Sequence, residues 1–160
     1  MKINTLYKNE RVSRKELRYA SIFMLAHLIE EHEHQKIQLI IESRKIKSRT
    51  KKDGVILGKT YPNYYDKYKF KIALDPNFSK KKQLITLAHE LIHVKQFLRG
   101  ELGATMKKDG VSLTKWKGEY VNETNEDYED WPWEIEARGR EYGLWRRYDN
   151  YIRKQKIKYK

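Results

Sequence analysis

The segment from Lys80 to Arg99 constrains the fold more than any other part of this sequence. Ser79 can cap its start and Gly100 can end it, so the pattern predicts one long helix. At 100° per residue its apolar side chains fall on two flanks. One flank consists of Leu84, Leu87, Leu91, Val94 and Leu98. The other contains Ile85 and Ile92, which lie on the same side as His89, His93 and Gln96. Because a helix that is apolar on both sides needs cover on both sides, we expect it at the centre of the domain.

The rest of the chain supplies short strands and two further helices. Ser13 with Glu16 forms a capping-box pattern that predicts a helix ending near Glu33, and Pro132 predicts the start of a last helix. Strands are predicted at Ile37 to Ile41, Val55 to Leu57 and Tyr68 to Leu74, and the last two are joined through Pro62 and a group of tyrosines. The segment Glu101 to Trp131 is predicted to be irregular, apart from a strand around Trp116 to Val121. We therefore expect one α+β domain over residues 1–160, with an N-terminal helix, a small twisted sheet, the central helix and a C-terminal helix.

The composition limits which metal ligands and which partners the chain can have. There is no cysteine, which excludes disulfides, thiolate metal sites and cysteine nucleophiles, so metal ligands would have to be histidines and carboxylates. Lys and Arg number 35 against 22 Asp and Glu, a net charge of +13 that favours an anionic partner or surface. The start of the chain lacks an apolar signal core and no run approaches about 18 apolar residues, so we expect a cytoplasmic protein with no membrane partner.

The sequence His89-Glu90-Leu91-Ile92-His93 lies within the central helix. Two imidazoles four residues apart share one helical face and can grip a single zinc ion, while Glu90 between them can reach a water molecule on that metal. Histidines on a solvated surface would be expected among lysines and glutamates rather than isoleucines. The pattern therefore favours a metal site.

A catalytic zinc needs a third protein ligand, and a carboxylate downstream of the motif is the natural source. Glu134 and Glu136 point about 200° apart on the last helix, so only one of them can face inward. Glu134 shares its face with Ala137 and Leu144, and we predict it as the third ligand. Glu141 and Glu136 are the alternatives. The competing role for Glu134 is that of a first-turn acid that interacts with the helix dipole.

These motifs resemble a known class of enzymes. The pair of His89 to His93 and the later Glu134-x-x-Ala137 resembles the gluzincin branch of zinc metallopeptidases, where HExxH is combined with a Glu-x-x-Ala-Asp-like segment. The wider match, about residues 70–150, is similar to small phage-encoded proteins grouped with SprT-like metallopeptidases. The resemblance implies a minimal zincin-like domain in which His89, His93 and Glu134 bind zinc and Glu90 is the general base.

The chain departs from the gluzincin pattern at Arg138, where many gluzincins have an Asp that orients a ligand histidine. Asp75, Glu141 or a backbone carbonyl could take that role. The chain also lacks the third histidine downstream of His93 that SprT-like enzymes commonly use.

The first functional hypothesis is a zinc-dependent metallopeptidase that acts on a protein or peptide substrate. Zinc lowers the pKa of its water toward about 7, Glu90 takes the proton, and Glu90 then passes it to the leaving amine. The donor to the developing oxyanion is left open among Tyr120, Tyr128, Tyr142 and a histidine of the pair His32 and His34. The strand Lys69 to Leu74 resembles the edge strand along which such peptidases align an extended substrate.

The second hypothesis is a basic nucleic-acid-associated binding protein in which the zinc site is structural or vestigial. Tyrosines at 61, 64, 65 and 68, interleaved with lysines at 59, 67 and 69, could stack bases while the lysines contact phosphates, although packed surface aromatics explain them equally well. The basic tail, about residues 146–160, carries seven Lys or Arg and is either a phosphate-contacting helix or a solvated face, of which we favour the second.

Overall fold

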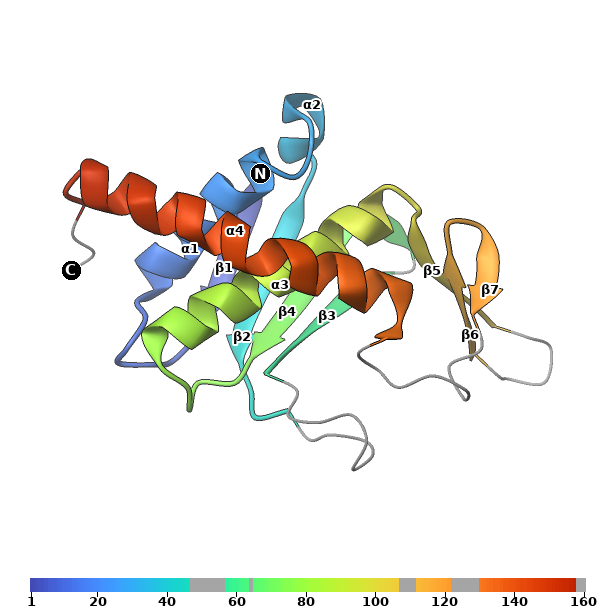
Figure 1. The fold of residues 1–160 in the computed structure, drawn as a ribbon, viewed down its shortest axis with the longest axis horizontal. Coiled ribbons are helices and arrows are strands. Elements are labelled where there is room, and N and C mark those ends of the chain that lie inside the picture. The colour runs from blue at the N-terminus through green and yellow to red at the C-terminus, as the bar shows by residue number, and fades with distance from the viewer. Residues whose placement is uncertain (47–56, 64, 107–111, 122–129, 158–160) are drawn as a thin grey trace.

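The computed structural model describes residues 1–46, 57–63, 65–106, 112–121 and 130–157, and within them the chain is α+β (Figure 1). The described helices are α1 (Arg14–Ala26), α2 (Glu31–His34), α3 (Lys80–Leu98) and α4 (Pro132–Lys154). The described strands are β1 (Lys2–Leu6), β2 (Gln38–Ser43), β3 (Gly58–Asn63), β4 (Asp66–Leu74), β5 (Leu102–Met106), β6 (Ser112–Trp116) and β7 (Glu119–Val121). None of these helices has the length and apolar character that crossing a membrane would require.

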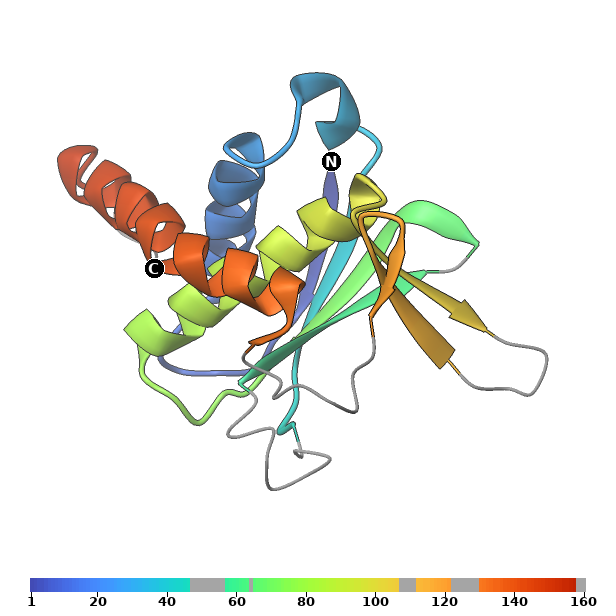
Figure 2. The same cartoon turned by 45° about the vertical axis from the view of Figure 1, so that its right-hand side comes forward.

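The larger sheet is mixed, with the strand order β1-β2-β4-β3. Strands β1, β2 and β4 are parallel, and β3 pairs antiparallel with β4 at one edge. As the alternation predicts, Leu39, Ile41, Phe70 and Ile72 are buried, whereas the side chains between them are exposed, namely Gln38, Ile40, Lys69 and Lys71. Figures 1 and 2 show α1, α3 and α4 together on one face of this sheet.

Helix α3 is the central element, as its two apolar flanks predict. It contacts β3 and β4 on one side and α4 on the other, and Figure 2 shows α4 crossing over it. Leu87, Leu91 and Ile92 are completely buried. The helix begins where expected, since the Ser79 side chain accepts a hydrogen bond from the backbone N–H of Lys82, and it ends before Gly100, which has a φ of 68°.

The N-terminal part differs from the prediction in two respects. Residues Lys2–Leu6 form a strand, β1, which the sequence did not indicate. The first helix is capped by Ser13 as expected but ends at Ala26, not near Glu33. The backbone N–H of Ile29 bonds to the carbonyl of Leu25, and this turn buries Ile29 in the core before the short helix α2 begins.

Strand β3 also lies differently from the prediction. Positions 55 and 56 are outside the described residues, and the strand begins after Leu57, at Gly58. Pro62, expected in a connection, is part of β3, where an edge strand can accommodate a residue without an N–H. The expectation that the strand Lys69 to Leu74 forms an edge is wrong, because β4 lies between β2 and β3. The edge strand beside α3 is β3.

The segment between α3 and α4 is more regular than predicted. Strands β5, β6 and β7 form a three-stranded antiparallel sheet. The strand expected from Trp116 to Val121 is interrupted by a tight turn, because Lys117 and Gly118 have φ values of 49° and 93°. Two successive positive φ angles are typical of a type I′ hairpin turn, so Trp116 pairs with Glu119 across it.

Candidate metal centre

Three side chains from two helices meet at one point, and we call them the His–Glu cluster: His89, His93 and Glu134. The two histidines are one turn apart on α3, and Glu134 lies in the first turn of α4, which crosses above them. The two Nε2 atoms are 3.0 Å apart. One carboxylate oxygen of Glu134 is 3.1 Å from Nε2 of His89, and the other is 3.3 Å from Nε2 of His93.

The spacing of these atoms suits a metal ion. Tetrahedral ligands at bond lengths of 2.0–2.1 Å are separated from one another by about 3.3 Å. The observed separations of 3.0, 3.1 and 3.3 Å agree with that geometry. The cluster is largely buried, with side-chain exposures of 13% for His89, 9% for His93 and 3% for Glu134. Among the described residues it is the only group of this kind that could hold a metal.

The tautomer of His93 is set by a neighbouring amide. Gln96 donates from Nε2 to the carbonyl of Trp133 at 3.0 Å and to Glu136 at 3.1 Å, which fixes the orientation of its amide. Its Oε1 therefore faces Nδ1 of His93, 2.7 Å away, and accepts a hydrogen bond from it. A proton on Nδ1 leaves the lone pair of Nε2 of the neutral ring directed into the cluster.

The tautomer of His89 is set by a carboxylate. Nδ1 of His89 donates to Glu141 at 2.7 Å, so its Nε2 lone pair also points inward when the ring is neutral. Glu141 thus lies on the outer side of the ring and not in the His–Glu cluster. Asp75, the other side chain considered for this role, bonds instead to Asn77. Two facing lone pairs and a carboxylate repel one another, and a cation between them would remove that repulsion.

The pKa shifts within the His–Glu cluster agree with the same need for positive charge. Burial alone would lower the pKa of His89, but the neighbouring carboxylates of Glu134 and Glu141 raise it to about 10. Burial would raise the pKa of Glu134, yet its contacts with both histidines hold it well below its usual value. The buried Oε2 of Glu134 nevertheless has no hydrogen-bond partner within the described structure, although Nε2 of His89 lies 3.1 Å away. This oxygen is directed at the centre of the cluster.

Glu90 is held against the edge strand of the mixed sheet. Its side chain is buried, and the Thr60 hydroxyl lies 2.7 Å from Oε2, to which it donates. A Cβ on Gly58 would lie 2.6 Å from Oε1 of Glu90, so only glycine permits this approach of β3 to α3. Burial raises the pKa of Glu90, although the two histidines beside it act in the opposite direction.

Glu136 belongs to a separate group, which we call the ion-pair cluster: Lys95, Glu101, Glu136 and Arg140. Lys95 is 4% exposed, and its ammonium lies 2.6 Å from Glu101 and 2.8 Å from Glu136. Arg140 donates to the same oxygen of Glu136 at 2.9 Å. Burial would raise the pKa of Glu136, but hydrogen bonds from Lys95, Gln96 and Arg140 lower it to about 2.

The tyrosines considered as oxyanion donors lie on different elements. Tyr120 is exposed on β7, and Tyr142 is exposed on α4 with its ring against Trp145. Tyr128 is outside the described residues. No local sequence pattern singles out Thr60 or Gly58, because they reach Glu90 only through the pairing of β3 with β4.

No family model, curated protein or solved structure matches this chain. What the site can do therefore follows from its own geometry. His89, His93 and Glu134 could hold one metal ion, with Glu90 buried on the same helix between the two histidines.

Proposed function

We propose that the protein is a zinc-dependent metallopeptidase of the gluzincin type, related to the SprT-like proteins that its motifs resemble. The observation that carries the proposal is the closed His–Glu cluster, in which both histidines are oriented with Nε2 inward. Two histidines and one glutamate, with a fourth position for water, are a ligand set of catalytic zinc in metallopeptidases. Other divalent ions accept the same ligands, and zinc is the ion that tetrahedral spacing favours.

In the proposed reaction the metal and the side chains have different roles. Zinc in such a site acidifies water and polarises a carbonyl oxygen. Glu90 is the general base in this proposal: its carboxylate accepts a proton from the attacking water and later donates it to the leaving amine. The burial that raises the pKa of Glu90 brings it closer to neutral pH, where proton transfer in both directions is efficient. Thr60 holds one carboxylate oxygen and so orients the other.

The substrate in this proposal is an extended peptide that adds to the edge of the mixed sheet. Strand β3 is the last strand of that sheet, and Thr60 within it contacts Glu90. A strand added at this edge would bond through its main chain, which allows many sequences to bind. In this proposal the substrate pairs with β3 and not with β4, because β4 lies inside the sheet.

The test compares Glu90→Gln with Glu119→Gln, a matched change at an exposed position on β7. Zinc-loaded proteins are incubated with labelled casein and with a mixed library of quenched peptides. We expect Glu90→Gln to lose hydrolysis by about 10²–10⁴-fold while it retains one equivalent of zinc, because only the proton acceptor is removed. Glu119→Gln should keep the wild-type rate. Hydrolysis by Glu90→Gln at the wild-type rate, or none by the zinc-loaded wild type, would contradict the proposal.

A further inference from the structure

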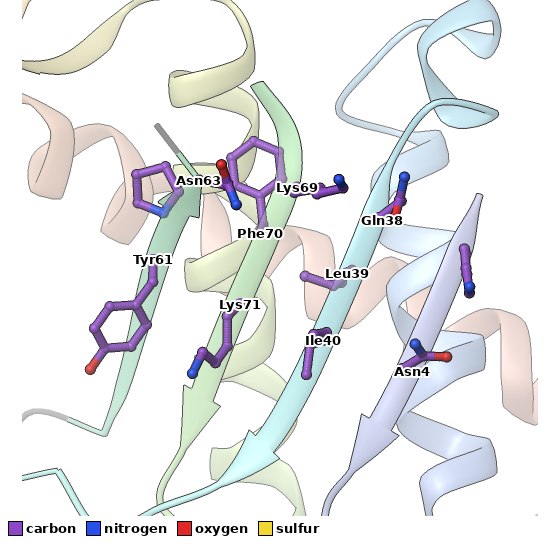
Figure 3. Close-up of a pocket in the computed structure, with 11 residues that line it drawn as sticks. Asn4, Gln38, Leu39, Ile40, Tyr61, Asn63, Lys69, Phe70 and Lys71 are labelled. Carbon is purple, nitrogen blue, oxygen red and sulfur yellow. The ribbon is translucent and has the colours of Figure 1, made fainter. Parts of the chain in front are cut away.

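The mixed sheet carries helices on one face only. In Figures 1 and 2, α1, α3 and α4 lie on one side, and none of the helices and strands that the structure describes covers the other. Figure 3 shows this second face with the helices behind it. We call it the open face and define it by Asn4, Gln38, Ile40, Tyr61, Lys69 and Lys71, which line a hollow of about 300 Å³.

Strand register arranges these side chains in rows. Asn4 is paired with Ile40, Ile40 with Lys71, and Lys71 with Tyr61, so one row crosses all four strands. Gln38 and Lys69 stand in the adjacent row. With strands about 4.8 Å apart, the longer row spans about 14 Å, a length that two or three bases on a sheet would occupy.

Positive charge dominates the open face. Lys69 and Lys71 project from β4, and Arg44 follows the end of β2 beside Tyr61. Two acids lie nearby: Glu42 is 3.4 Å from Arg44 and 3.8 Å from Lys71, and Asp66 is 3.1 Å from Lys69. Three cations therefore face two carboxylates, and Lys2, which also lines the hollow, adds a further positive charge. An anionic partner would therefore be attracted to this face, in keeping with the net charge of +13.

Aromatic, aliphatic and amide side chains lie among these cations. The ring of Tyr61 has the guanidinium of Arg44 at 5.1 Å and the ammonium of Lys59 at 5.5 Å from its centroid. Ile40 is 38% exposed in the same row, and the side-chain amides of Asn4 and Gln38 stand beside it. Single-stranded nucleic acid needs such a combination, since its bases lie on apolar or aromatic side chains while lysines and arginines contact phosphates.

We propose that the open face binds single-stranded nucleic acid. The bases lie along the row from Asn4 to Tyr61, where they contact Ile40 and the ring of Tyr61, and Lys69 and Lys71 contact the phosphates. A duplex keeps its bases stacked inside and cannot use this surface, and an acidic peptide has no bases to place on it. The proposal is independent of peptide hydrolysis, because the His–Glu cluster lies on the helical side of the sheet.

The test measures the fluorescence anisotropy of a labelled oligo(dT) of about 12 nucleotides, a length within the range that single-strand-binding surfaces cover. The zinc-loaded Glu90→Gln protein serves as background, and salt is varied between about 50 and 200 mM. We expect the paired change Lys69→Thr and Lys71→Thr to weaken binding at least about tenfold and to reduce the salt slope by about 1.4, or about 0.7 per phosphate contact. Threonine suits an exposed strand position, so β4 should be retained.

A second variant separates stacking from charge. Tyr61→Leu should weaken binding at least about fivefold and leave the salt slope unchanged, because it removes an aromatic surface and no charge. The matched control, Arg146→Gln with Lys154→Gln, removes two exposed cations from α4 and should change affinity by less than about twofold. Thermal unfolding and zinc content identify any variant that fails to fold.

Four results would overturn the proposal. They are the absence of binding at low salt, equal loss in the α4 control, equal affinity for a duplex of the same length, and a Tyr61→Leu protein that binds like its parent. Displacement of the oligonucleotide by polyglutamate or by vesicles of anionic lipid at equal charge concentration would likewise assign the surface to another partner.

Discussion

Two polar clusters lie between the same pair of helices, and they differ in how their charges are balanced. In the ion-pair cluster, Glu136 is neutralised by Lys95 and Arg140 from within the chain. In the His–Glu cluster, two residues earlier on α4, Glu134 faces two imidazole nitrogens. The first cluster is complete, whereas the second is balanced only if a proton or a metal ion supplies the charge. Similar glutamates on one helix can therefore stabilise the fold or bind a ligand, according to the side chains that face them.

The largest expected effect is on metal affinity. Glu134→Gln should weaken zinc binding at least about a thousandfold, or about 4 kcal/mol, because it replaces a charged ligand with a neutral amide. Glu136→Gln, the matched change in the ion-pair cluster, should alter zinc affinity less than about tenfold. Competition with a chromophoric chelator measures both. Equal losses in the two variants would remove the distinction between the clusters.

The next effect is the contribution of zinc to stability. With free zinc at about 100 times the Kd, binding should raise the free energy of unfolding of the wild type by about 2.7 kcal/mol. Chelation should abolish this increment in the wild type and have almost no effect on Glu134→Gln. Denaturant unfolding with and without chelator measures this free energy. An identical response in both proteins would place the bound zinc outside the His–Glu cluster.

Substitutions of the residues that orient the two histidines should have intermediate effects on zinc affinity. Gln96→Met removes the acceptor for Nδ1 of His93 while it keeps a similar shape, and Glu141→Ala removes the acceptor for His89. Each should weaken zinc binding about 10–100-fold. Glu141→Gln retains an acceptor oxygen and should recover most of the loss. If Glu141→Ala binds zinc as the wild type does, the contact of Glu141 with His89 has no bearing on the metal.

The smallest effect concerns acid stability of the ion-pair cluster. The pKa of Glu136 is lowered to about 2. Its contribution to the free energy of unfolding is therefore fully present above the ordinary pKa of 4.5 and is lost as the pH falls toward 2. Because Glu136 is partly exposed, we expect this contribution to be roughly 1–2 kcal/mol. Glu136→Gln should therefore be less stable than the wild type at pH 6 and should approach it near pH 2. Denaturant unfolding as a function of pH checks this, and parallel curves for the two proteins would contradict it.

Local patterns predicted much of this molecule. The capping positions Ser13 and Ser79, the alternation of β2 and β4, and the two-sided burial of α3 all depend on neighbours within a few residues. The inward orientation of Glu134 follows from the apolar residues on its face of α4. These features were predictable because helix caps and the periodicity of helices and strands depend on residues that are close in the sequence.

The remaining features depend on how distant elements meet. Glu134 and Glu141 are two turns apart on one face of α4, so periodicity could not distinguish them as ligands. The crossing of α4 over α3 places Glu134 beside Nε2 of His89 and Glu141 beside Nδ1. The position of β3 at the edge of the sheet likewise depends on strand order, which alternation does not encode, and with it the contact between Thr60 and Glu90.

The most direct test is anomalous diffraction at the zinc edge from crystals of the zinc-loaded protein. We expect one strong peak bonded to Nε2 of His89, Nε2 of His93 and a carboxylate oxygen of Glu134, at about 2.0–2.2 Å from each. A peak bonded to Glu136 or to an Nδ1 atom, or the absence of any peak between these three side chains at saturating zinc, would contradict the assignment of the His–Glu cluster as a metal site.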